Sequence, residues 1–69
     1  MNVQWQEFIE ERQDLMGGKP TLKGTRLTVD FVLRQMGAGM SRDELLHQYP
    51  TLKPEHLPAV FLYAADLVK

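Results

Sequence analysis

The 69-residue sequence contains no cysteine, which excludes disulfide bonds and thiolate metal sites as sources of stability. Its two histidines, His47 and His56, lie far apart in the chain, and no acidic cluster completes a ligand set around them. We therefore expect neither a metal nor any other cofactor. Because a chain of this size buries only about 60% of its unfolded surface, extra stability has to come from a tight helical core or from oligomerisation.

Long apolar runs are also missing. The longest nearly unbroken run, residues 57–65, contains Pro58 and is too short to cross a bilayer, and no signal peptide is apparent. We expect a soluble, cytoplasmic protein that has no contact with membranes. The balance of 43% hydrophobic and 25% charged residues is typical of a globular domain. Because the formal net charge is −1, any affinity for nucleic acid has to come from a local basic patch.

Groups suited to catalysis are scarce as well. Ser41 is the single serine and fits a helix cap, and no carboxylates are spaced for acid–base chemistry. Gly18 and Lys19 look like the end of a phosphate-binding loop, but Pro20 follows where Ser or Thr is required. Proline has no N–H to donate and cannot continue a helix interior. The sequence therefore predicts neither an enzyme nor a nucleotide-binding loop.

A turn-rich, basic stretch lies at residues 17–29. Residues 23–26 contain the glycine that a tight turn needs, and they separate two β-rich segments, 20–22 and 27–29. We expect a β-hairpin over residues 17–28. Residues 1–16 form an N-terminal docking segment before it, and its aromatic pattern fits both a short helix and a strand.

Three segments with helical periodicity follow, at about residues 29–36, 41–49 and 54–68. Ser41 with Glu44 three residues later predicts a capping box at the start of the second helix. Pro58 should bend the third helix or delay its start. The helix-three positions expected in the core are 57, 60, 61, 64, 67 and 68, and those expected to face outward are 59, 62, 63 and 66. The short connections predict a mostly α, three-helix, helix-turn-helix core at residues 29–69 of a single domain, 1–69.

A series of short motifs is specific at the level of a protein family. In chain order they are GKP at 18–20, KGTRLTV at 23–29, AGMS at 38–41, ELL at 44–46, YP at 49–50, Leu52, and PE at 54–55. From about residue 9 to the last residue, this series closely resembles the prokaryotic domain-of-unknown-function family four-three-three, described as VapB-like antitoxins. Two residues depart from the family pattern: Pro58 interrupts the last helix, and Lys53 replaces the threonine that usually caps it.

The resemblance implies a homeodomain-like, trihelical DNA-binding fold with a small β element ahead of it. It also implies an antitoxin of a toxin–antitoxin pair, whose partner is often a PIN-like ribonuclease and whose DNA target is its operator. The alternative function is a protein-interaction module, a dimerisation domain that uses a helix-turn-helix fold without binding DNA.

Contacts to DNA, if the first function holds, are expected to be electrostatic and to come from the hairpin and the helix ends. A reading helix presents Arg, Lys, Asn or Gln to base edges, and the outward positions of the third helix hold none of these. Arg26 also suits an ion pair within the fold or across a dimer, and we favour that interpretation for it. The candidate DNA-binding residues are Lys19, Lys23, Thr25, Arg26, Arg42, Thr51, Lys53 and His56.

Apolar residues outside the expected helical core predict a partner surface. Exposed apolar clusters usually mark an interface, and twofold dimers are the commonest arrangement. We expect a homodimer that buries residues 62–63, the segment 5–9, or both. The alternative is a monomer in which the N-terminal segment folds over its own third helix. The candidate interface residues are Trp5, Phe8, Ile9, Phe31, Leu62 and Tyr63.

Overall fold

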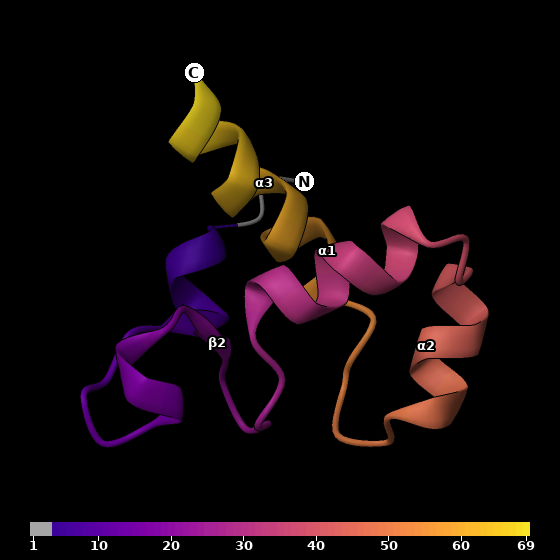
Figure 1. Cartoon of the computed structure of the whole chain (residues 1–69), viewed down its shortest axis with the longest axis horizontal. Coiled ribbons are helices and arrows are strands. Elements are labelled where there is room, and N and C mark those ends of the chain that lie inside the picture. Colours follow the sequence, from indigo (N-terminus) through magenta and orange to yellow (C-terminus); the bar gives the residue numbers. More distant parts are fainter. Residues whose placement is uncertain (1–3) are drawn as a thin grey trace.

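A computed structural model describes residues 4–69, so the first three residues of the predicted docking segment lie outside the described residues. Three α-helices follow a two-stranded antiparallel sheet, which confirms the mostly α fold predicted from the sequence (Figure 1). Over residues 4–69, no helix combines the length and the hydrophobicity that crossing a membrane requires. The elements are η1 (Trp5–Glu7), β1 (Ile9–Glu10), η2 (Met16–Gly18), β2 (Thr21–Leu22), α1 (Val29–Gly37), α2 (Arg42–Gln48) and α3 (His56–Val68).

The boundaries of α1 and α2 follow their local capping signals. The hydroxyl of Thr28 accepts the N–H of Phe31 at 3.2 Å and caps the start of α1. Gly39, with a φ of 103°, supplies the left-handed residue expected after α1. At the start of α2, the Ser41 hydroxyl accepts the N–H of Glu44 at 3.1 Å, and the Glu44 carboxylate accepts the N–H of Ser41 at 3.0 Å. The predicted capping box is thus confirmed.

The sheet lies where a β element was predicted, but its pairing differs from the predicted hairpin. β2 pairs with β1, with Ile9 opposite Leu22. Residues 27–29 return along the other side of β2 through a single bridge between Thr21 and Thr28 and a bond from the Leu22 N–H to the Leu27 carbonyl at 2.9 Å. Because α1 begins at residue 29, the second arm is too short for a ladder. The predicted hairpin is therefore reduced to a tight turn, and the N-terminal segment supplies the partner strand.

The buried face of α3 matches the prediction in part: Leu57 and Val60 are buried and Leu62 is exposed as predicted, but burial also extends to residues predicted to point outward. Ala59 and Tyr63, predicted to face outward, are 0% and 8% exposed, whereas Phe61 and Leu67, predicted to be buried, are 48% and 69% exposed. The prediction followed from 3.6-residue spacing alone. In the structure η1 packs against α3 as well, and the Trp5 ring stands edge-on to Tyr63 with 4.8 Å between centroids. The covered surface of α3 is therefore shared between η1 and α1.

Pro58 is accommodated at the start of α3 rather than inside it. The helix begins at His56, so Pro58 occupies its first turn, and its side chain is exposed. The first N–H groups of a helix have no intrahelical acceptor, so the N–H that proline lacks is not missed there. The predicted delay of the helix start is observed, because α3 begins at residue 56 and not at the predicted residue 54.

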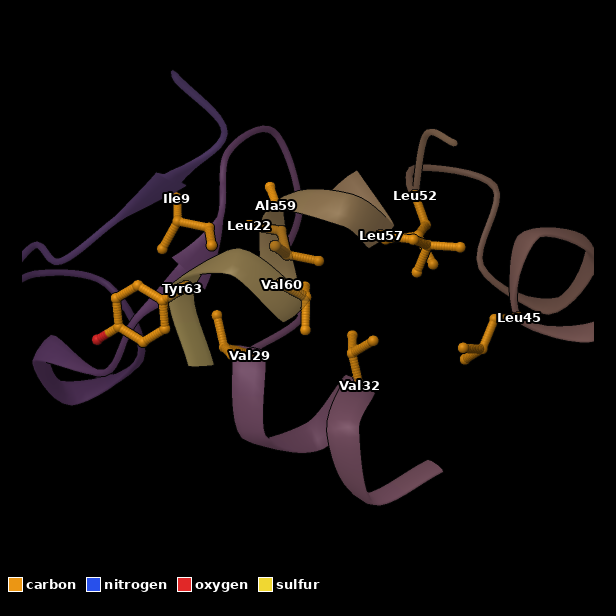
Figure 2. Close-up of a cluster of buried hydrophobic side chains, with 10 residues drawn as sticks. All are labelled: Ile9, Leu22, Val29, Val32, Leu45, Leu52, Leu57, Ala59, Val60 and Tyr63. Atoms are coloured by element: carbon orange, nitrogen blue, oxygen red, sulfur yellow. The ribbon is translucent and has the colours of Figure 1, made fainter. Parts of the chain in front are cut away.

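The buried core draws on every major element (Figure 2). Leu45 from α2 lies at one end of the cluster, and Ile9 from β1 and Tyr63 from α3 lie at the other. The prediction that Ile9 stands outside the core was wrong, because pairing of β1 with β2 carries it inward. The ten buried hydrophobic residues are Ile9, Leu22, Val29, Val32, Leu45, Leu52, Leu57, Ala59, Val60 and Tyr63.

Candidate functional site

The tight turn at residues 23–26 is built by one threonine and one glycine. The Thr25 hydroxyl donates to the Leu22 carbonyl at 2.8 Å and accepts the N–H of Leu27 at 2.9 Å. Gly24 has a φ of 81°, a conformation that other residues rarely adopt. Thr25 is buried, with its hydroxyl occupied inside the turn. The predicted role of Thr25 as a DNA contact is therefore corrected: it shapes the turn that presents its neighbours.

His56 connects this turn to the loop before α3. Its Nδ1 accepts the N–H of Lys53 at 2.8 Å, so the hydrogen-bond pattern assigns the ring proton to Nε2, which lies 3.1 Å from the carbonyl oxygen of Lys23. The side chain is only 4% exposed, and the Phe8 ring packs edge-on against it. Burial lowers the pKa of His56, which favours the neutral imidazole. The predicted contact of His56 with DNA is wrong, because the ring is enclosed.

Four of the predicted DNA-binding residues are gathered at the place that His56 connects. Lys23 and Arg26 come from the turn, Thr51 and Lys53 come from the loop between α2 and α3, and all four are exposed. Arg26 and Thr51 line one shallow, open concavity of about 590 Å³. We call these four residues the two-loop surface.

Within residues 4–69, the three cations of the two-loop surface, Lys23, Arg26 and Lys53, have no ion-pair partner. The intramolecular ion pair favoured for Arg26 is thus not formed among the described residues. At the rim of the same concavity, Glu10 lies 3.8 Å from Arg12, which offsets its charge.

Lys19 and Arg42, the remaining DNA candidates, lie elsewhere. The Lys19 ammonium is 4.0 Å from the carboxylate of Asp30, which also pairs with Arg34 at 3.6 Å. A hydrogen bond from the Thr28 hydroxyl, followed by these cations, lowers the pKa of Asp30. Arg42 is exposed in the first turn of α2. The structure therefore brings four of the eight candidates together, uses two within the fold, and separates two.

The second half of α3 carries a set of exposed hydrophobic side chains. One of them, Leu67, lines an apolar groove of about 270 Å³ between α1 and α3, together with Pro20, Leu33 and Ala64. Three of these side chains, Phe61, Leu67 and Val68, were not predicted to be exposed, because helical periodicity assigned them to the core. We call the set Phe61, Leu62, Leu67 and Val68 the apolar end of α3.

Most of the predicted partner surface is used within the chain instead. The Trp5 Nε1–H donates to the Asp66 carboxylate at 2.7 Å, and the Tyr63 hydroxyl donates to Glu11 at 3.4 Å. Phe8 packs against His56, and Phe31 packs edge-on against Tyr49. The N-terminal segment thus folds over its own third helix, as the alternative prediction stated. Of the six candidates, Leu62 is the large hydrophobic residue that stays exposed.

Comparison with known proteins supplies one curated relative. The chain is 33% identical over 58 residues to the uncharacterized protein y4eO of Sinorhizobium fredii, a match that covers 84% of this chain and 26% of the relative. The chain thus spans about a quarter of the length of the curated relative it matches. No solved structure matches it.

The family comparison matches residues 9–64, which include the motifs from GKP through the start of α3. The match covers all three helices except the end of α3, together with both strands. The chain belongs to the family described as Protein of unknown function (DUF433).

Proposed function

We propose that this chain is an antitoxin-like binding protein of a toxin–antitoxin pair that works in the cytoplasm. Its protein partner is a PIN-like ribonuclease, its nucleic-acid partner is operator DNA, and its role is binding rather than catalysis. The apolar end of α3 carries the proposal. Four large hydrophobic side chains, 42% to 84% exposed, are distributed around the part of α3 that follows Val60. Apolar clusters of this kind on small proteins usually mark a protein partner's site.

The motifs that resemble VapB-like antitoxins support the choice of partner. Those motifs lie in the turns and caps that hold α3 in place, for example the residues 23–26 turn and the capping box of α2. The apolar end of α3 projects beyond this framework toward the carboxyl end of the chain (Figure 1). A ribonuclease that covers the apolar end of α3 would therefore leave the framework unchanged.

Co-expression with the product of the neighbouring gene, which the proposal expects to be a PIN-like ribonuclease, tests the proposal. We expect the two proteins to co-elute in size-exclusion chromatography and the ribonuclease to lose activity on RNA in the complex. Leu62→Glu, which places a charge in the apolar end of α3, should dissociate the complex. The matched control is Gln48→Glu, an exposed position on α2 that should leave the complex intact. Separate elution of the wild-type proteins, with ribonuclease activity unchanged, would contradict the proposal.

A second candidate function is a protein-interaction module that does not bind DNA. The exposed positions of α3 favour it: Pro58, Phe61, Leu62 and Ala65 offer no hydrogen-bond donors to base edges, and the net charge is −1. This candidate predicts self-association through the apolar end of α3 and no retardation of duplex DNA at low salt. A gel-shift titration on the DNA upstream of the gene separates the two functions.

A further inference from the structure

We propose that the two-loop surface binds the phosphate backbone of duplex DNA, and that His56 is the positioning residue that holds its two loops together. The inference deepens the DNA-binding part of the proposed function and rests on it. It places the contact away from the exposed face of α3 and replaces base reading by recognition of phosphates.

The geometry starts from a single imidazole ring. His56 bonds to the backbone N–H of Lys53 at 2.8 Å through one nitrogen and faces the backbone carbonyl of Lys23 at 3.1 Å through the other. The backbones of Lys23 and Lys53, thirty positions apart in the sequence, are therefore held together by one imidazole ring and its two hydrogen bonds. Their side chains remain exposed.

Each loop is also stiff on its own side of the ring. Thr25 closes the turn through both of its hydroxyl bonds, and the N–H of Lys23 donates to the Phe8 carbonyl at 2.8 Å. In the other loop, the N–H of Leu52 donates to the Tyr49 carbonyl at 2.8 Å. A surface ordered before binding loses less conformational freedom when a ligand arrives. The loops therefore hold fixed the backbone positions from which the cationic side chains extend.

The chemistry of the surface suits phosphate rather than bases. Lysine, arginine and threonine side chains supply most contacts to DNA phosphates, and such contacts carry no direct sequence information. The cations have no intramolecular partners among the described residues, so none has to break an ion pair before binding. Binding through the two-loop surface should consequently be strong at low salt and indifferent to the order of the bases, so this surface supplies affinity for DNA and not the choice of the operator.

Salt titration of the full chain on a short duplex, and on a scrambled duplex of the same length, tests the inference. If three phosphates are neutralised, the affinity should fall about 40-fold between about 50 mM and 200 mM salt, and only about 12-fold when one cation is removed. Lys23→Gln, Arg26→Gln and Lys53→Gln should each show the smaller fall. The control Arg34→Gln, an exposed cation paired with Asp30 on α1, should keep the larger one.

His56→Leu distinguishes positioning from charge. We expect it to lower the affinity about tenfold at each salt concentration while the salt slope stays that of the wild type, since all the cations remain. Far-UV circular dichroism checks that the variant folds. If it does not fold, the three cation variants decide, because their side chains are exposed and make no ion pair that the fold needs.

Two results would overturn the inference while the wild type still binds DNA. The first is an equal loss of salt slope in Arg34→Gln and in the loop variants. The second is binding to the scrambled duplex more than about tenfold weaker, the size of one base-specific contact. Absence of wild-type binding at low salt would remove the DNA-binding part of the proposed function together with this inference, and the ribonuclease experiment would be unaffected.

Discussion

His56 shows how one side chain takes the place of two backbone partners. At the start of α2, the side chain of Glu44 accepts the N–H of the residue three positions earlier. His56 does the same for Lys53 with Nδ1, and its second nitrogen meets the Lys23 carbonyl. The N-cap of α3, Glu55, makes no side-chain capping bond, and the histidine, the first residue of the helix, instead holds the N–H of Lys53 in the turn before it. A charged imidazole has protons on both nitrogens and can no longer accept the Lys53 N–H.

Stability should therefore fall on acidification. Burial lowers the pKa of His56 in the folded chain, opposed by the Lys23 carbonyl and by Glu55, while Lys53 acts with burial. Because the folded pKa lies below the unfolded value of about 6.5, the unfolded chain binds more protons in the window between them. The contribution is fully present above about pH 6.5 and is lost as the pH falls through that window.

Urea denaturation from about pH 7.5 down to about pH 5 measures this loss. The wild-type midpoint should decrease across the window, and His56→Leu should flatten the curve. His47→Gln, at an exposed position of α2, serves as the control and should keep the wild-type slope. A His56→Leu curve as steep as that of the wild type would refute the assignment.

Gly24 and Gly37 form a matched pair at which an added methyl group meets open space. Gly24 has a φ of 81°, whereas Gly37 ends α1 without a positive φ, and no heavy atom lies within 4 Å of a Cβ built at either position. Gly24→Ala should lower the free energy of unfolding by about 1–2 kcal/mol, the cost of the left-handed conformation. Gly37→Ala should raise it by up to about 1 kcal/mol. Urea unfolding measures both, and changes of the same sign would show that backbone conformation does not decide them.

At the scale of elements, η1 and α3 are joined by a bond that a spectroscopic probe can follow. Trp5 is the only tryptophan, and its Nε1–H donates to Asp66 at 2.7 Å while its ring stands against Tyr63. Asp66→Ala should cost about 1 kcal/mol of unfolding free energy and shift the tryptophan emission to longer wavelength as η1 loosens. Asp66→Asn keeps an acceptor and should stay close to the wild type. Unchanged emission in Asp66→Ala would show that the hydrogen bond does not hold η1.

Local signals in the sequence predicted the elements that close their own hydrogen bonds. The capping box of α2 and the glycine after α1 involve partners only a few residues apart, so both were readable in advance. The signal for His56 was present too, since Lys53 and His56 have the same spacing as Ser41 and Glu44. An exposed polar helix position was instead the default interpretation for a histidine.

The remaining features depend on contacts between distant segments. β1 and β2 are joined across residues 11–20, and two-residue strands carry too little pattern to reveal their partner. The full buried face of α3 could not be read from helical periodicity, because η1 packs against α3 from a second side and Trp5 covers Tyr63. The two-loop surface combines residues whose types were predicted individually, but their proximity arises from the His56 bonds.

At the scale of the whole molecule, the apolar end of α3 replaces the dimer surface predicted from the sequence. In the absence of a ribonuclease partner, we expect a homodimer that buries Leu62 and Leu67, because the segment around Trp5 is already occupied within the chain. Light scattering at micromolar concentration should give about twice the chain mass of 8.0 kDa. Leu67→Glu should shift the dimer toward the monomer, whereas Gln48→Glu should not. A wild-type species with the mass of one chain, near 8.0 kDa, would contradict the dimer.

The bond between Trp5 and Asp66 also places the beginning and the end of the described fold side by side, across 61 positions of sequence. A polypeptide that enters this fold near residue 4 leaves it close to where it entered. Domains with this property can be inserted into a surface loop of another protein without separating the two halves of their host. The fold is therefore suited to insertion as a domain within a longer polypeptide. Its relative from Sinorhizobium fredii is about four times as long as the matched region, so a structure of that protein would show whether the domain is inserted in this way.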